Sequence, residues 1–133
     1  MSGIRSVLDG AFAADTANPG TVPSVPSAGH CAAVAAILYA RYGGHLVSAN
    51  VEGESHWFNR LPTYSGPMDI DLTADQFGRS RVNFSTAKKL YPRSRQRQAD
   101  DLLPETVSRA QLLAERAGIA FSPAKFPRYQ LVS

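Results

Sequence analysis

The amino-acid sequence predicts an α+β fold in which a small antiparallel sheet packs on one central, buried helix. The first observation behind this prediction is the segment 30–42, which is rich in alanine and apolar on nearly every side, as a buried helix is. The second is a set of three segments, 45–51, 55–61 and 68–72, that have the composition of strands and are joined by short turns. Strands joined in this way pair antiparallel, so we expect a meander that lies against the helix.

The N-terminal part is expected to add one helix and one connection. Apolar residues recur there at helical spacing, which predicts a first helix over residues 3–15. They are Ile4, Val7, Leu8, Ala11 and Phe12. Three prolines within residues 15–27 favour an extended surface connection. Turn-forming residues precede the central helix, and Gly43 and Gly44 follow it as a stop.

Beyond the third strand the expected elements are short until the last helix. Residues 73–77 predict a short helical turn. The stretch 79–101 is basic and polar and matches no single element. Pro104 suits the first turn of a helix that we expect to run to Ala117 and to close at Gly118.

Composition bounds the class of protein. Hydrophobic residues make up 44% of the 133 residues, enough for a packed core. We therefore expect a single domain over residues 1–133, with residues 121–133 as a candidate flexible tail. One cysteine excludes an internal disulfide framework and a multi-cysteine zinc site, and we expect no metal and no cofactor. There is no apolar run of about 18 residues and no signal-peptide pattern, which predicts a cytoplasmic protein without a membrane partner.

A basic stretch supplies much of the net charge of +3. Its residues are Arg79, Arg81, Lys88, Lys89, Arg93, Arg95 and Arg97. Such a run can contact phosphates, but no aromatic residues suited to stacking bases are interleaved with it. A solvated basic face is therefore the favoured interpretation, and a nucleic-acid partner is not expected. An RNA- or anion-binding protein that uses residues 79–97 is the weaker alternative.

The single cysteine, Cys31, stands where the central helix should begin. A thiol in the first turn of a helix meets backbone N–H groups without helical partners and the positive end of the helix dipole, and both favour the reactive thiolate. His56 lies on the second predicted strand, and Asp69 and Asp71 lie on the third. A cysteine on a helix, followed by a histidine and a carboxylate on strands, is the chain order of papain-like and transglutaminase-like thiol enzymes.

Alternation along the strands decides which of these side chains can meet. In a hairpin of the second and third strands, His56, Asp69 and Asp71 share one face. Trp57, Ile70 and Leu72 share the other face. A pairing centred near residues 63–64 puts His56 opposite Asp71. A slip of two residues puts it opposite Asp69, so spacing alone leaves the choice of carboxylate open.

The residue types fit one chemical apparatus. An imidazole takes the proton of the thiol, a carboxylate holds the imidazole's other N–H, and the backbone N–H of Cys31 can bind an oxyanion. Each residue also has a structural interpretation. A lone cysteine among alanines is typical of a core, a strand histidine is often structural, and Asp71 can cap the turn at Thr73.

Three further residues are candidates for binding a substrate. His30 adjoins Cys31, but consecutive helix residues point about 100° apart, which makes His30 a poor base. It is instead a candidate substrate-binding residue, together with Trp57 and Asn59 of the His56 segment.

The motifs taken together resemble the YunG-like family of small bacterial proteins. The resemblance covers most of residues 5–117 and rests on PSAGHCAAVAAIL, SHWFNRL, DIDLTADQF and a later helix with ETVSRAQLL. It implies that Cys31, His56 and Asp71 occupy the family's Cys, His and Asp positions, which favours the second of the two aspartates. Further matching positions are Asn59, Arg60, Thr73, Gln76 and Phe77.

One departure from the family pattern precedes the cysteine. The family usually has glutamine there, and this chain has His30. An oxyanion-binding role of that glutamine therefore does not carry over. The resemblance implies a fold and a candidate site, and it supplies no activity.

These observations give a first and a second functional hypothesis. The first is a papain-like thiol hydrolase or acyl transferase that acts on an amide bond of a peptide or protein. The second is a non-catalytic binding or regulatory module on the same scaffold. Peptidase, amidase and deamidase chemistry share the apparatus, so the sequence does not choose among them.

Overall fold

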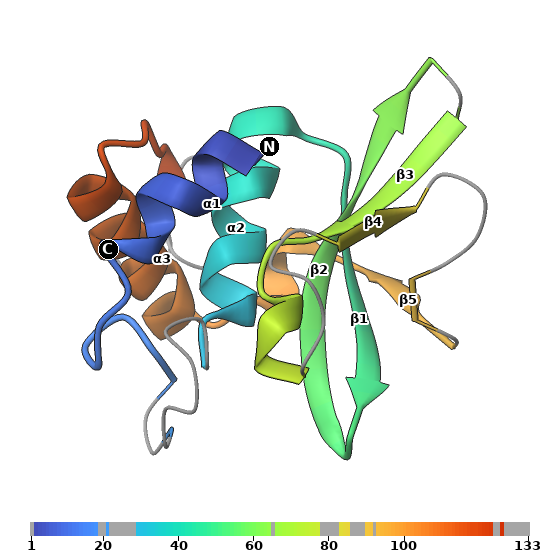
Figure 1. The fold of residues 1–133 in the computed structure, drawn as a ribbon, viewed down its shortest axis with the longest axis horizontal. Coiled ribbons are helices and arrows are strands. Elements are labelled where there is room, and N and C mark those ends of the chain that lie inside the picture. Colours follow the sequence, from blue (N-terminus) through green and yellow to red (C-terminus); the bar gives the residue numbers. More distant parts are fainter. Residues whose placement is uncertain are drawn as a thin grey trace.

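In the described part of the chain, a five-stranded antiparallel sheet has three α-helices on one side (Figure 1). The computed structural model describes residues 2–18, 21, 29–64, 66–77, 83–85, 90–91, 93–123 and 126. The helices are α1 (Ser2–Asp9), α2 (Cys31–Tyr42) and α3 (Pro104–Ala117). The strands are β1 (His45–Val51), β2 (Glu54–Thr63), β3 (Gly66–Asp71), β4 (Asn83–Ser85) and β5 (Arg95–Arg97). Their order in the sheet is β4-β3-β2-β1-β5, so the predicted α+β class with an antiparallel sheet is confirmed.

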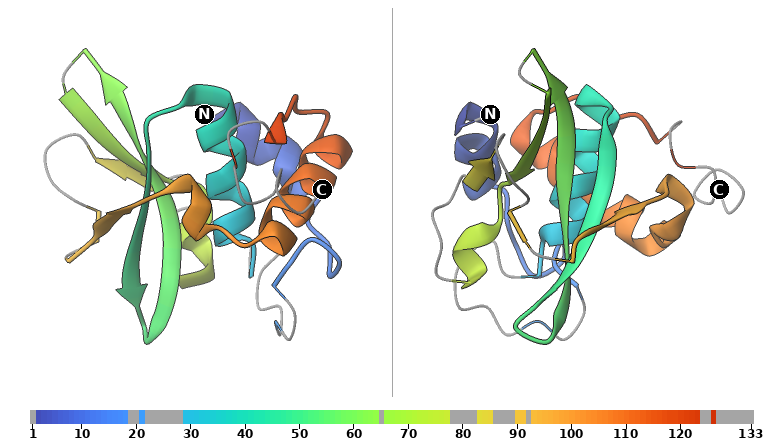
Figure 2. Two further views of the ribbon diagram at one scale, coloured as in Figure 1. Left: turned by 180° about the vertical axis from the view of Figure 1, so that it is seen from behind. Right: turned by 90° about the vertical axis from the view of Figure 1, so that its right-hand side faces the viewer.

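The central helix α2 is buried because it packs on two sides. It contacts β2 and β1 of the sheet and also α3, and Figure 2 shows it between the sheet and the other helices. All of its residues from Cys31 to Leu38 are buried, as the apolar composition predicted. The helix stops at Gly43, which has a φ of 73° that side-chain-bearing residues rarely adopt.

The first helix is shorter than predicted, and a different face of it is buried. α1 ends at Asp9, just before Gly10, so the predicted helix over residues 3–15 is wrong at its C-terminal end. Val7, expected on the apolar face, is 46% exposed, whereas Arg5 is 1% exposed. Two carboxylates and a carbonyl neutralise the guanidinium of Arg5, which is why a charged residue can replace an apolar one in this interface.

The β2–β3 hairpin has the predicted faces but a different register. The two strands meet at a two-residue turn with Thr63 opposite Gly66, and this register puts Arg60 opposite Asp69. Neither of the two registers considered from the sequence is correct, since the turn lies one residue further along than residues 63–64. The shift moves every pair by two positions, and because side chains alternate, it leaves each of them on the expected face.

The remaining segments are short except for the last helix. The short helices η1 (Ala74–Phe77) and η2 (Ala99–Asp101) follow β3 and β5. α3 begins at Pro104 and closes at Gly118 in the left-handed conformation, as predicted. Phe126 is buried against Tyr39 and Phe121, which places part of the candidate tail in the core.

Several sequence predictions concern residues outside the described part of the chain. They include Arg79, Arg81, Lys88 and Lys89 of the basic stretch, and most of the predicted connection over residues 15–27. Within the described residues, no helix is both long and apolar enough to span a membrane.

Gly43 and Gly44, which follow α2, give a matched test of how closely the chain approaches β2 at this point. A Cβ on Gly44 would lie 2.5 Å from the carbonyl oxygen of Arg60, whereas a Cβ on Gly43 meets nothing within 4 Å. Both residues have positive φ, at 73° for Gly43 and 72° for Gly44. Gly43→Ala should therefore lower the free energy of unfolding by about 1–3 kcal/mol through backbone strain alone. Gly44→Ala should lower it clearly further in urea denaturation, and equal losses would contradict the close approach of Gly44 to β2.

Candidate active site

The site is built around His56, a buried histidine on β2. Its side chain is 1% exposed, and its Nε2 lies 2.6 Å from Oδ2 of Asp71, the last residue of β3. The rings of Phe58 and Tyr91 pack against the imidazole, and their centroids lie 6.2 Å and 5.4 Å from the centroid of the His56 ring. Burial between aromatic rings keeps water from competing for the His56–Asp71 hydrogen bond.

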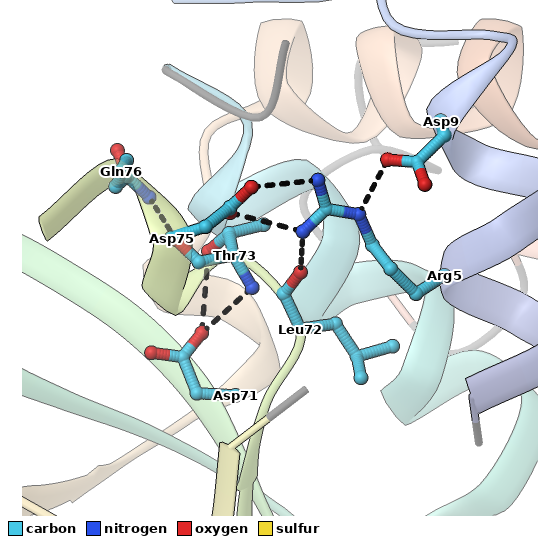
Figure 3. Close-up of polar contacts among 7 residues, drawn as sticks. All are labelled: Arg5, Asp9, Asp71, Leu72, Thr73, Asp75 and Gln76. Carbon is cyan, nitrogen blue, oxygen red and sulfur yellow. Dashed lines mark hydrogen bonds and ion pairs between the residues drawn. The ribbon is translucent and has the colours of Figure 1, made fainter. Parts of the chain in front are cut away.

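Four donors converge on the carboxylate of Asp71. Oδ2 accepts from His56 and from the hydroxyl of Tyr91. Oδ1 accepts from the backbone N–H of Thr73 at 3.0 Å and from the Thr73 hydroxyl at 3.2 Å. Figure 3 shows these last two contacts at the point where β3 turns into η1. A buried carboxylate with this many donors is held in one position, and so it fixes the imidazole that it contacts.

Cys31 is the third member of the site. It is the first residue of α2 and 8% exposed. Its thiol interacts with the ring of His56 and contributes to the raised pKa of that histidine. Since Asp71 occupies Nε2, the nitrogen left for the thiol is Nδ1, which is buried and makes no hydrogen bond of standard geometry with the described residues. The ring thus lies between a thiol and a carboxylate.

The surroundings of His56 favour its charged form. Burial by itself lowers the pKa of His56, but the hydrogen bonds and negative charges of Asp71 and Cys31 outweigh burial and raise the pKa from 6.5 to about 9. An imidazolium at neutral pH can stabilise a thiolate next to it. When the ring is neutral, Nε2–H donates to Asp71 and leaves Nδ1 to accept the thiol proton.

The structure separates the two aspartates that the sequence left open. Asp69 accepts from Nε of Arg60 at 2.6 Å and from the backbone N–H of Leu90 at 3.1 Å. It therefore holds its own partners, and Asp71 is the carboxylate that contacts His56. Among the described residues, no group of three His, Cys, Asp or Glu side chains is placed to hold a metal ion.

Arg5 of α1 fixes the loop that follows Asp71 (Figure 3). Its guanidinium donates to the carbonyl of Leu72 at 2.7 Å, to both carboxylate oxygens of Asp75 and to Asp9. Burial lowers the pKa of Arg5, but Asp75 and Asp9 raise it above its ordinary value, so Arg5 stays cationic. The chain on both sides of Thr73 is thereby held, and Thr73 supplies two of the donors to Asp71.

The same N-terminal segment also reaches the residue before the cysteine. Oγ1 of Thr16 lies 2.7 Å from Nε2 of His30, and the His30 ring packs on Phe12 at 4.5 Å between centroids. Phe12 in turn lies under the guanidinium of Arg5, 5.3 Å from its ring centroid. One segment thus contacts both the N-terminal end of α2 and the loop after β3.

The three candidate substrate-binding residues lie in the interior or at its edge. His30 is 2% exposed and bonded to Thr16. Asn59 is 1% exposed and donates to the carbonyl of Ala35 in α2 at 3.0 Å. Trp57 is half-buried and packs against the main core, with Arg97 4.9 Å above its ring centroid. All three have contacts that hold the fold together.

Two residues of the site, Tyr91 and Arg5, were not predicted from the sequence. Tyr91 lies in the stretch that matched no element, where Leu90 and Tyr91 form an apolar pair among basic residues. This apolar pair was the one feature of the stretch that could have indicated a buried position for Tyr91. Arg5 is a single charge one turn before Leu8 on α1, and its partners in η1 are about seventy residues away in the sequence, as the separation between Arg5 and Asp75 shows.

Removing the guanidinium of Arg5 should weaken the whole arrangement. Arg5→Met keeps much of the side-chain volume and removes the donors to Leu72, Asp75 and Asp9. We expect a loss of roughly 2–4 kcal/mol in the free energy of unfolding, because a buried cation network is broken on one side. Urea denaturation measures it. Arg116→Met, which removes an exposed pair with Asp15, is the control and should change stability little. Equal effects of the two substitutions would contradict the role of Arg5.

Comparison with known proteins identifies the family. A family model described as YunG protein matches residues 1–118 of the chain, which includes α1 and every residue of the site. No curated protein and no solved structure gives a significant match. The match covers most of the sequence, and the chain therefore belongs to the YunG family.

Proposed function

We propose that the protein is a papain-like thiol hydrolase or acyl transferase that acts on an amide bond. The single observation that carries the proposal is the placement of a buried imidazole between the Cys31 thiol and the Asp71 carboxylate, with the pKa of His56 raised to about 9. A histidine that only filled the core would need neither a thiol nor a charged carboxylate as its partners.

The reaction would use each residue in one role. Below about pH 9 His56 Nδ1 already holds the proton that Cys31 has given up, and the thiolate attacks the carbonyl carbon of the amide. The backbone N–H of Cys31, in the first turn of α2, supports the oxyanion that forms. The imidazolium then gives its proton to the leaving amine, which leaves an acyl group on the sulfur. Transfer of this group to water or to an amine completes hydrolysis or acyl transfer. Asp71 keeps its charge throughout and orients the ring.

Two structural features support this assignment of roles. Cys31 starts a buried helix, and His56 and Asp71 follow on successive antiparallel strands. This is the chain order of the residues in papain-like and transglutaminase-like thiol enzymes, which favours the same roles here. Cys31 is also the most exposed of the three, at 8% against 1% for His56 and for Asp71. A nucleophile must meet its substrate, whereas a base and its orienting carboxylate can remain covered.

The alternative is a non-catalytic binding or regulatory module on the same scaffold. It is favoured by the contacts of His30 and Asn59, which tie the site's neighbourhood to the rest of the fold. In that case His56 and Asp71 would be a buried polar pair that specifies the packing of β2 and β3, and the thiol would be inert.

The rate of alkylation of Cys31 separates the two functions. Below about pH 9 His56 carries a proton and can stabilise a thiolate, so Cys31 should react with iodoacetamide already near pH 6. His56→Gln should slow the reaction at pH 6 at least about tenfold, because it removes the cation. Asp71→Asn should slow it less, since the ring remains but loses its orientation. The measurement is the pH profile of labelling by mass spectrometry.

A matched control is available in the exposed His45 at the start of β1. His45→Gln should leave the profile unchanged, and circular dichroism should show that all variants are folded. An unreactive Cys31 in the wild type, or a profile that does not respond to His56→Gln in a folded variant, would support the non-catalytic module.

A further inference from the structure

A second polar site lies on the strands that carry His56. A groove of about 310 Å³ opens beside the β1–β2 hairpin. It is lined by Ser48, Ala49, Asn50, Ser55, Arg93 and Arg95. Ala49 is the strand partner of His56, and Arg95 is the strand partner of Ser48 across β1 and β5. None of these six residues has a carboxylate, and two carry a full positive charge.

The polar groups of this groove are arranged as hydrogen-bond donors. A guanidinium has five N–H groups and accepts nothing. Oδ1 of Asn50 accepts from the backbone N–H of Gly53 at 3.0 Å, which leaves the NH2 end of the amide for another partner. Oγ of Ser48 accepts from Arg97 at 3.2 Å, so its own hydrogen is the part that can serve a ligand. The groove therefore favours a ligand that is rich in hydrogen-bond acceptors.

The backbone that presents the two arginines is anchored. Tyr91 donates to Asp71, and Arg60 donates to Ser94 at 3.4 Å. From Arg95 onward the chain is paired with β1. Arg93 stands between these anchors with a φ of 59°, a conformation that a residue with a side chain keeps only where its neighbours impose it. The exposed side chains of Arg93 and Arg95 thus extend from a fixed backbone, which lowers the entropy cost of binding.

We infer that this groove binds a phosphate monoester group. Three oxygens with two negative charges can take up donors from both arginines and from the neutral groups of Ser48, Asn50 and Ser55 together, whereas a carboxylate has only two oxygens. The volume is at the lower end for ligand pockets, which fits the phosphate end of a small molecule. Asp101 attracts Arg95 from outside the lining and is the acidic group that a phosphate must compete with. The inference does not depend on the proposed thiol chemistry.

Titration of the full ¹⁵N-labelled chain with inorganic phosphate tests the site. At constant ionic strength in chloride, the backbone amides of residues 48–50, 55, 93 and 95 should shift and saturate. Arg95→Ala and Arg93→Ala should each weaken binding about 5- to 10-fold, since each removes a charge-assisted contact. Ser55→Ala should weaken it less, because it removes a neutral donor.

Arg41→Ala is the matched control, because it removes one exposed arginine at the end of α2, away from the lining residues. It should leave the affinity for phosphate unchanged. An equal loss in this variant would show attraction by net charge alone and overturn the site, as would the absence of saturable shifts. Acetate that binds as tightly as phosphate would overturn the preference for phosphate. Tighter binding of an oligonucleotide without a terminal phosphate would overturn the monoester assignment in favour of nucleic acid.

Discussion

The hydrogen bond between His56 and Asp71 is the interaction on which the site depends. Both side chains are 1% exposed, so each would carry a large desolvation penalty if it were charged and alone. Thr73 and Tyr91 also donate to Asp71. Burial lowers the pKa of His56, but its interactions with Asp71 and then with Cys31 outweigh burial and raise the pKa to about 9. A charged imidazole beside the thiol is the direct consequence.

The elements around this hydrogen bond are arranged to keep it in place. Arg5 holds the loop after Asp71, and Thr16 holds the residue before Cys31. Phe12 packs between these two contacts, against both Arg5 and His30. The N-terminal segment therefore links the helix that begins at Cys31 with the strand that ends at Asp71. A small α+β domain has few layers with which to position three side chains. The contacts of the N-terminal segment help to hold Cys31 and Asp71 in place.

Local signals made the helices and the faces of the strands predictable. α2 is apolar on all sides and is followed by Gly43, so it was predicted to within one residue at its start. α3 has Pro104 at its start and Gly118 at its end, so it was predicted with its bounds. The alternation of side chains along the two paired strands was enough to place His56 and Asp71 on one face of the sheet. The hairpin register depends on one turn residue, and it was predicted wrongly by two positions.

Contacts between distant parts of the chain explain what the sequence did not predict. The burial of Arg5 depends on Asp75, and the role of Tyr91 depends on Asp71, twenty residues away. No periodicity or motif encodes such partners. Val7 was predicted on the buried face of α1 for the same reason, but it is exposed. The partners of the Arg5 guanidinium, rather than the apolar pattern, determine which face of α1 is buried.

The pKa of His56 in the folded protein is the most direct test of whether its buried ring is charged at neutral pH. NMR titration of the imidazole ¹³Cε1 signals, assigned by loss of one signal in His56→Gln, gives the pKa of each histidine in the folded protein. We expect that His56 titrates near pH 9 and that Asp71→Asn lowers its pKa, because burial then acts against a weaker partner. A wild-type His56 that titrates at or below pH 6.5 would show that the buried ring is not held in its charged form. An unchanged pKa of His56 in Asp71→Asn would show that Asp71 does not raise it.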